Sequence, residues 1–156
     1  MNSALVSIVI AFVVVRLLSS IIFPTMSKNA KQLSLDDILV ISKSGKLNKS
    51  PITIVDVRSP EEFSSGHIKN AHNVPVQELQ GALKLSSDDF KKKYHFKLPP
   101  ANGETGLAVY CMSGKRAGLA TNHLAEAKYL KNLYAYLPGW SEFSHKATAA
   151  DIATTK

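Results

Sequence analysis

The stretch "GLAVYCMSGKRAG" (106–118) runs from apolar residues into a thiol, a short polar loop and two adjacent cations. Residues 106–110 are predicted to form a short buried strand, which places Cys111 at its C-terminal end. From residue 116 to residue 129 the apolar residues recur at helical spacing. A strand, a tight loop and a helix in this order are typical of one repeat of an α/β domain.

The rest of the chain repeats this alternation. Apolar runs at 52–57, 73–76 and 133–136 predict three further strands. Helices are predicted after Ser34, after Ser59-Pro60, within 76–85 and after Ser86 or Ser87. The stretch "PGWSEF" (138–143) is predicted to be a turn that leads into a last short helix. Short buried strands that alternate with helices indicate an α/β domain with a central, mainly parallel sheet.

The loop after residue 110 has the chemistry of an anion cradle. In α/β folds ligands bind beyond the carboxyl ends of the strands, which is the position of Cys111. Gly114 permits a tight curl, so backbone N–H groups and the helix N-terminus can point inward. With Lys115 and Arg116, these groups favour a thiolate nucleophile. An inert core cysteine is the alternative, but it leaves the glycine and the two cations unexplained.

Three separated motifs resemble the rhodanese-type sulfurtransferases. "IVDVRSPEEFSSGHIKNAHNVP" (54–75) is similar to their first signature, "YCMSGKRAG" (110–118) to their active-site loop, and "YLPGWSEF" (136–143) to their closing motif. "SSDDFKKKYHFKLPP" (86–100) resembles the insert of small eukaryotic single-domain members. The resemblance implies a rhodanese-like three-layer domain over residues 34–146.

The resemblance also implies a reaction. Cys111 would take a sulfane sulfur from thiosulfate or a similar donor as a persulfide, and an external thiol or cyanide would remove it. The loop amides would stabilise the persulfide, and the cations would bind the donor. The implied substrate-binding residues are Met112, Ser113, Gly114, Lys115 and Arg116. Because Cys111 is the only cysteine, the acceptor must come from outside the chain. No cofactor and no metal is implied.

Five further residues are interpreted as structural support. Sulfur transfer from a thiolate needs no strong general base. Asp56, Arg58, Glu62 and His67 are therefore expected to stabilise the first loop, which is the segment that follows the strand predicted at 52–57. Trp140, in the closing motif, is expected to pack over the domain edge near the site.

Two other functions stay open at this point. A phosphatase or arsenate reductase of related fold would also use a cysteine in an anion cradle. Those enzymes have one more residue between cysteine and arginine, whereas four residues separate Cys111 from Arg116. The second alternative is a membrane-tethered binding module without turnover.

The N-terminal segment predicts a membrane anchor over residues 1–26. Residues 4–23 are almost wholly apolar and contain one charge, Arg16, and a membrane-spanning helix needs about 20 such residues. A cleavable signal peptide, a mitochondrial transit peptide and a buried core helix are the alternatives; the segment lacks the basic start of the first and the amphipathic, arginine-rich character of the second. Lysines follow the segment and none precedes it, so the positive-inside rule leaves the domain on the cytosolic or equivalent side. The predicted membrane is that of the endoplasmic reticulum or the mitochondrion.

Length and composition set the remaining limits. The chain has 156 residues, room for one ordinary domain, and its single cysteine excludes both an internal disulfide and a multi-cysteine zinc site. The net charge of +7 is spread along the chain, and no nucleic-acid motif accompanies it. Residues 24–33 are predicted to be a polar linker and residues 147–156 a mobile tail.

Overall fold

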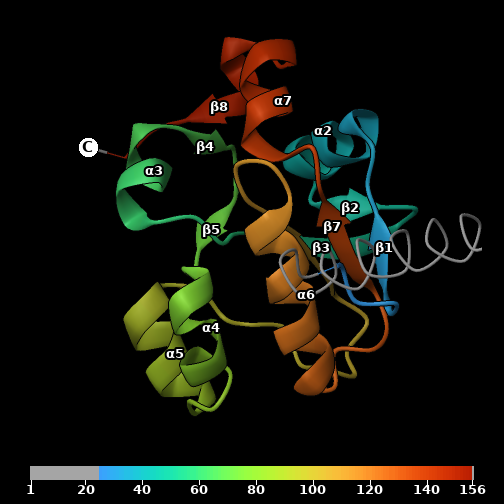
Figure 1. Cartoon of the computed structure of the whole chain (residues 1–156), viewed down its shortest axis with the longest axis vertical. Helices are drawn as coiled ribbons and strands as arrows, with labels where there is room; N and C mark the ends of the chain where they lie inside the picture. The colour runs from blue at the N-terminus through green and yellow to red at the C-terminus, as the bar shows by residue number, and fades with distance from the viewer. Residues whose placement is uncertain (1–24, 156) are drawn as a thin grey trace, which may run out of the picture.

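The computed structural model describes residues 25–155 and has a mainly parallel sheet at its centre (Figure 1). Its strand order is β1–β7–β6–β3–β2, and β5 pairs with β3. All pairs are parallel except that of β2 with β3. The strands are β1 (Ala30–Gln32), β2 (Lys46–Leu47), β3 (Ser50–Asp56), β5 (His72–Asn73), β6 (Gly106–Tyr110) and β7 (Leu133–Tyr136). The predicted α/β class is therefore confirmed.

Helices cover both faces of this sheet, which makes three layers. On β6, Leu107 and Val109 belong to one apolar core, while Ala108 and Tyr110 belong to the other. This alternation follows from the two-residue period of a strand. The first core is closed by α4 (Val76–Ala82), α5 (Ser87–Tyr94) and α6 (Lys115–Glu126), and the second by α2 (Leu35–Ser44) and α7 (Gly139–Lys146).

Three predicted helix starts are confirmed by the side chains that cap them. The Oγ of Ser34 accepts the N–H of Asp37 at the start of α2, and the Oγ of Ser86 accepts the N–H of Asp89 at the start of α5. The Oγ of Ser59 likewise accepts the N–H of Glu62 at the start of α3 (Pro60–Ser65), which has a proline in its first turn. Each cap satisfies a backbone donor that the first helical turn leaves without a partner.

Part of the predicted linker at 24–33 is a strand instead. β1 lies parallel to β7, and the N–H of Ser27 donates to Thr121 Oγ1 at 2.9 Å. Only Ala30 among the three residues of β1 is buried, so the sequence carries no alternation that could predict it. Backbone pairing, not an apolar side-chain pattern, holds this edge of the sheet.

Two other boundaries differ from the sequence prediction. The strand predicted at 73–76 is limited to His72–Asn73, because Pro75 lacks an N–H and α4 begins at Val76. The predicted mobile tail includes a 3₁₀ turn at Ala149–Asp151 and β8 (Ile152–Ala153), which pairs with β4 (His67–Ile68). Buried Asp151 ion-pairs with Lys43 at 3.2 Å and fixes this segment to α2.

Within residues 25–155, no helix has the length and apolar character needed to cross a membrane. The predicted span at 4–23, and all but the last two residues of the predicted anchor at 1–26, lie outside the described residues.

Candidate active site

Cys111 directly follows β6, and its sulfur lies inside the loop that leads into α6. The Sγ atom accepts the N–H of Gly114 at 3.1 Å and the N–H of Ala117 at 3.3 Å. Gly114 has a φ of +94°, and a Cβ at this position would lie 2.8 Å from the carbonyl oxygen of Leu137. Glycine is needed here both for the backbone conformation and for the close approach of a second loop. The donors aimed at the sulfur are those that stabilise an anion at a helix N-terminus.

The N-terminal end of α7 holds the loop in this orientation. The N–H of Trp140 donates to the Cys111 carbonyl at 2.8 Å, and the N–H of Ser141 donates to the Met112 carbonyl at 3.0 Å. Gly139 has a φ of +64°, and a Cβ there would collide with the carbonyl oxygen of Cys111. These two hydrogen bonds fix the start of the Cys111 loop against α7.

The site presents the loop, rather than the thiol, to solvent. Cys111 is 1% exposed, whereas Met112 is 37% exposed, and Ser113 and Lys115 are also exposed. The cavity beside the loop has a volume of about 400 Å³, and its lining includes Ser113, Gly114 and Lys115. Thr25 and Met26 line it too, so the N-terminal end of the described chain reaches the Cys111 loop.

Arg116 pairs with Glu62 of α3. Its two terminal nitrogens donate to the two carboxylate oxygens at 2.6 and 2.9 Å, and both side chains are about 30% exposed. The hydrogen bond from Arg116 lowers the pKa of Glu62 from 4.5 to about 2. From the sequence, Glu62 is interpreted only as a residue that stabilises the first loop. The contact with Arg116 is not predicted, because the two residues lie 54 positions apart along the chain.

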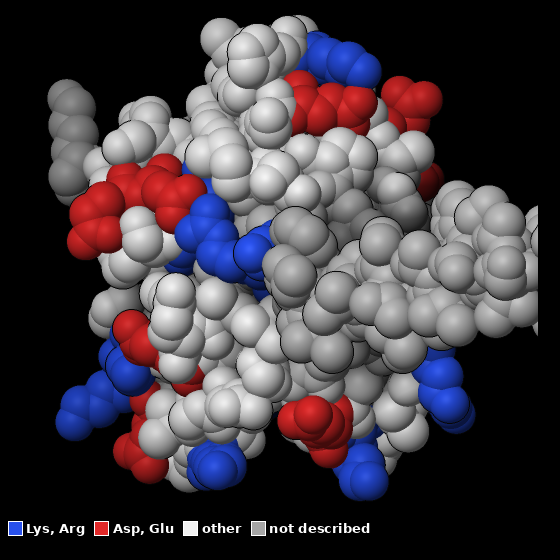
Figure 2. All heavy atoms as spheres, viewed as in Figure 1, with Lys and Arg blue, Asp and Glu red and all other residues white. Residues whose placement is uncertain are grey.

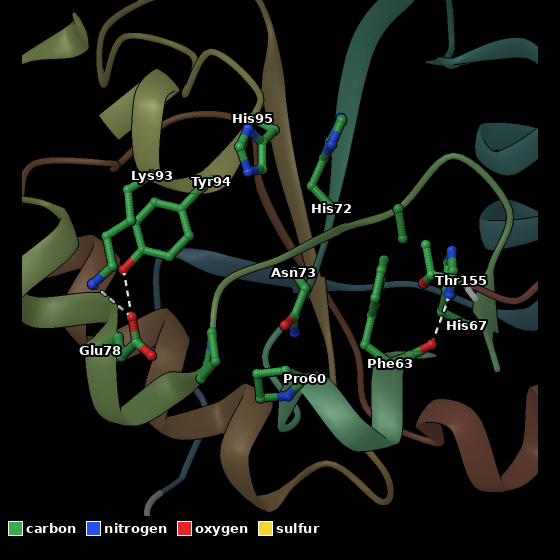
Figure 3. A pocket seen from close by; sticks show the side chains of 12 residues that line it. Pro60, Phe63, His67, His72, Asn73, Glu78, Lys93, Tyr94, His95 and Thr155 are labelled. Atoms are coloured by element: carbon green, nitrogen blue, oxygen red, sulfur yellow. Dashed lines mark hydrogen bonds and ion pairs between the residues drawn. The ribbon is translucent and has the colours of Figure 1, made fainter. Parts of the chain in front are cut away.

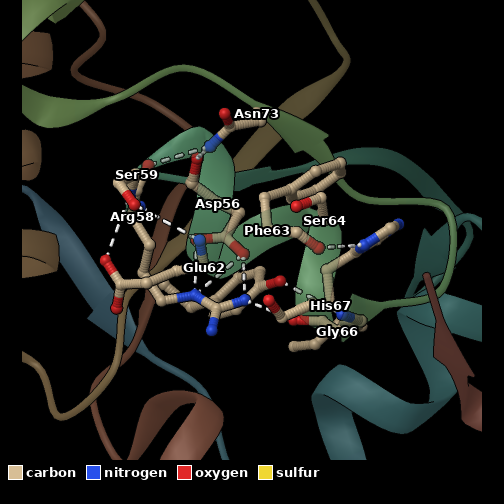
Figure 4. Close-up of polar contacts among 12 residues, drawn as sticks. Asp56, Arg58, Ser59, Glu62, Phe63, Ser64, Gly66, His67 and Asn73 are labelled. Carbon is tan, nitrogen blue, oxygen red and sulfur yellow. Dashed lines mark hydrogen bonds and ion pairs between the residues drawn. The ribbon is translucent and has the colours of Figure 1, made fainter. Parts of the chain in front are cut away.

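Asp56 and Arg58 form a buried ion pair beneath the first loop (Figure 4). The Arg58 Nη2 donates to Asp56 Oδ2 at 2.6 Å, its Nε donates to both carboxylate oxygens at 3.0 Å, and its Nη2 also donates to the Gly66 carbonyl at 2.7 Å. Neither side chain is more than 1% exposed. The guanidinium lies 4.9 Å from the ring of Trp140, so the pair connects the first loop to the closing motif.

His67 and Trp140 lie at the rear of the same loop. The ring of His67 stacks on Phe63 with centroids 3.6 Å apart, and its Nδ1 lies 2.8 Å from the Phe63 carbonyl (Figure 4). A Cβ at Gly66 would lie 2.9 Å from the Trp140 ring, so that ring covers the end of α3. These contacts give both residues packing partners around the end of α3.

A larger cavity of about 570 Å³ lies between α3 and α5 (Figure 3). Its walls include Phe63, His72 and Tyr94, and an ion pair between Glu78 and Lys93 at 2.8 Å lies beside it. Cys111 does not line this cavity. Among residues 25–155, no group of His, Cys, Asp and Glu side chains is arranged to hold a metal ion.

The fold and the cysteine loop together define a rhodanese-like domain. The model of the rhodanese-like domain family matches residues 40–146, and the chain belongs to this family. A Schizosaccharomyces pombe protein, named provisionally as a mitochondrial thiosulfate sulfurtransferase, is 36% identical over 78% of this chain and 83% of its own. The human thiosulfate:glutathione sulfurtransferase is 32% identical over 75% of this chain and 96% of its own.

A solved structure leads to the same class. The single-domain sulfurtransferase RDL2 of Saccharomyces cerevisiae superimposes with a TM-score of 0.69 and 27% identity, over 81% of this chain and 98% of that one. The comparisons therefore support an enzyme of the sulfurtransferase class, as the sequence predicted.

Proposed function

We propose that the protein transfers a sulfane sulfur from thiosulfate or a similar donor to a thiol or cyanide through a persulfide on Cys111. The observation that carries the proposal is the pair of backbone N–H groups directed at Sγ. Donors placed there favour the thiolate, which is the nucleophilic form of cysteine. They would also stabilise the negative charge of the persulfide.

The first half-reaction balances without an added oxidant or reductant. The thiolate attacks the outer sulfur of thiosulfate, the new bond joins the two sulfurs, and the old sulfur–sulfur bond breaks. Its electron pair leaves with sulfite, and the persulfide anion stays in the loop. In the second half-reaction an external thiolate or cyanide attacks the outer sulfur and restores the Cys111 thiolate.

The roles of the remaining residues follow from their positions. Met112, Ser113 and Lys115 stand at the exposed side of the loop, where a donor would arrive. Arg116 would bind its oxyanion end through the guanidinium fork. Asp56, Arg58, His67 and Trp140 would support the loops and contact no reacting atom.

Intact mass spectrometry tests the chemical step. After exposure to thiosulfate, the protein should gain the mass of one sulfur atom, and a thiol reductant should remove it. Cys111→Ser should neither gain the sulfur nor turn over, because a hydroxyl is hardly ionised near neutral pH. A native protein that never carries the sulfur but hydrolyses aryl phosphates would favour the phosphatase alternative. Absence of both activities would favour the binding module.

We also propose that residues 4–23 anchor the domain to a membrane. Two relatives, from Schizosaccharomyces pombe and Saccharomyces cerevisiae, are named as mitochondrial sulfurtransferases, which supports a mitochondrial membrane. The test is extraction with alkaline carbonate, which should leave the full chain in the membrane and release a chain shortened to residues 25–156. Release of both would reject the anchor.

A further inference from the structure

The Glu62 carboxylate already occupies the position on Arg116 where an oxyanion would bind. It accepts from both terminal nitrogens of the guanidinium, with the two-point geometry that arginine uses for carboxylates and other planar or tetrahedral oxyanions. Figure 2 shows acidic groups over α3 in contact with basic groups beside the N-terminal end of α6. An incoming donor anion can therefore bind to Arg116 through both terminal nitrogens only after the Glu62 carboxylate has moved away.

Arg116 lies in the first turn of α6, next to Ala117, whose N–H reaches the Cys111 sulfur at 3.3 Å. The hydrogen bond to Glu62 and, to a smaller extent, the charge interaction with Cys111 raise the pKa of the Arg116 guanidinium, so its charge acts on the reacting sulfur. Both partners of the ion pair are partly exposed, so solvent and small ions reach the contact. The contact can therefore be exchanged for another anion without unfolding the site.

We propose that Glu62 sets the donor specificity of the enzyme by competing with the incoming oxyanion for Arg116. The inference rests on the sulfur-transfer function proposed above. A donor binds in the productive position only when its oxyanion displaces the Glu62 carboxylate. Displacement leaves that carboxylate beside the donor, and its charge repels a dianion more than a monoanion.

The expected size of the effect follows from the exposure of the pair. A partly exposed ion pair shifts an equilibrium by roughly fivefold, which corresponds to about 1 kcal/mol. The apparent dissociation constant of a ligand equals its intrinsic dissociation constant divided by the fraction of protein that is in the binding-competent state. Removing the charge of Glu62 should therefore lower the KM for thiosulfate about fivefold.

Glu62→Gln is the informative variant because it keeps the local fold. The Glu62 Oε2 also accepts the N–H of Ser59, and its own N–H donates to Ser59 Oγ, which closes the capping box of α3. Glutamine serves equally well at this position of a capping box. Glu61→Gln is the matched control, since Glu61 is the preceding residue of the same helix and its side chain is exposed.

Steady-state kinetics with two donors test the proposal. Thiosulfate and methanethiosulfonate break the same kind of sulfur–sulfur bond but carry two negative charges and one. Glu62→Gln should lower the KM for thiosulfate about fivefold, lower that for methanethiosulfonate less, and leave kcat within about twofold. Glu61→Gln should change neither KM by as much as twofold. A KM for thiosulfate that rises or stays constant in Glu62→Gln would overturn the proposal, because Glu62 would then position Arg116 rather than compete for it.

A binding measurement separates this proposal from the proposed reaction. In the Cys111→Ser background no sulfur transfer is expected, yet sulfite can still bind to Arg116. Calorimetry should show about fivefold tighter sulfite binding when Glu62→Gln is added, and no change when Glu61→Gln is added. Equal affinities would refute the competition even if the native enzyme forms a persulfide. If the native enzyme forms none, tighter sulfite binding would still support the competition while the proposed reaction fails.

Discussion

Replacing Asp56 by asparagine should destabilise the protein far more than its single charge suggests. The change leaves the Arg58 guanidinium 1% exposed with a neutral hydrogen-bond partner. The Gly66 carbonyl, the Tyr110 side chain and the Trp140 ring around it are also neutral, and the Glu62 carboxylate that acts on it already pairs with Arg116. Breaking one side of a buried ion pair typically costs about 3–5 kcal/mol, since an uncompensated charge stays buried. A loss of that size removes a fifth or more of the stability of a small domain, which is about 5–15 kcal/mol.

Urea denaturation can measure this loss. Trp140 is the only tryptophan in the chain and lies next to Arg58, so its fluorescence reports on the region, and circular dichroism provides a second probe. Adding Arg58→Met to Asp56→Asn should restore part of the lost stability, because no charge then stays buried. Lys146→Met is the control, since it removes an exposed ion pair with Glu142 and should cost less than about 1 kcal/mol. A loss below about 1 kcal/mol for Asp56→Asn, or a double variant less stable than the single one, would refute the reasoning.

Two further predictions concern stability. The folded-state pKa of Glu62, about 2, lies below the ordinary 4.5, so the Arg116 pair stabilises the fold above pH 4.5 and this stability is lost as the pH falls toward 2. The contribution is about 1 kcal/mol, less than the full pKa difference implies because the pair is partly exposed. The difference in the free energy of unfolding between pH 3 and pH 6 should therefore be smaller for Glu62→Gln than for the native chain. Gly139→Ala should lower both stability and sulfur transfer, because its Cβ would collide with the Cys111 carbonyl at a positive φ, whereas Gly81→Ala in α4, where a Cβ meets nothing within 4 Å, should raise the melting temperature. Equal melting shifts for the two glycines would contradict that comparison.

The sequence predicts the central elements because their signals are local. The strand at 106–110, the strand at 133–136 and the three capped helices each carry an apolar run or a capping residue within a few positions. β1 was missed because pairing with β7, and not its side chains, makes it a strand. The approach of Glu62 to Arg116 was missed for a related reason. A capping glutamate predicts the start of α3, but nothing near it indicates which distant cation its carboxylate will meet.

The order of strands in the sheet explains why motifs far apart in sequence meet around the Cys111 loop. β3, β6 and β7 are neighbours and parallel, so the segments that follow them end at the same edge. The segment after β3 supplies Arg58, the one after β6 supplies Cys111, and the one after β7 supplies Trp140. Trp140 holds the Cys111 carbonyl with its N–H while its ring faces the Arg58 guanidinium. Because one residue makes both contacts, loss of the buried ion pair should loosen the closing motif and, with it, the orientation of the amides around the sulfur.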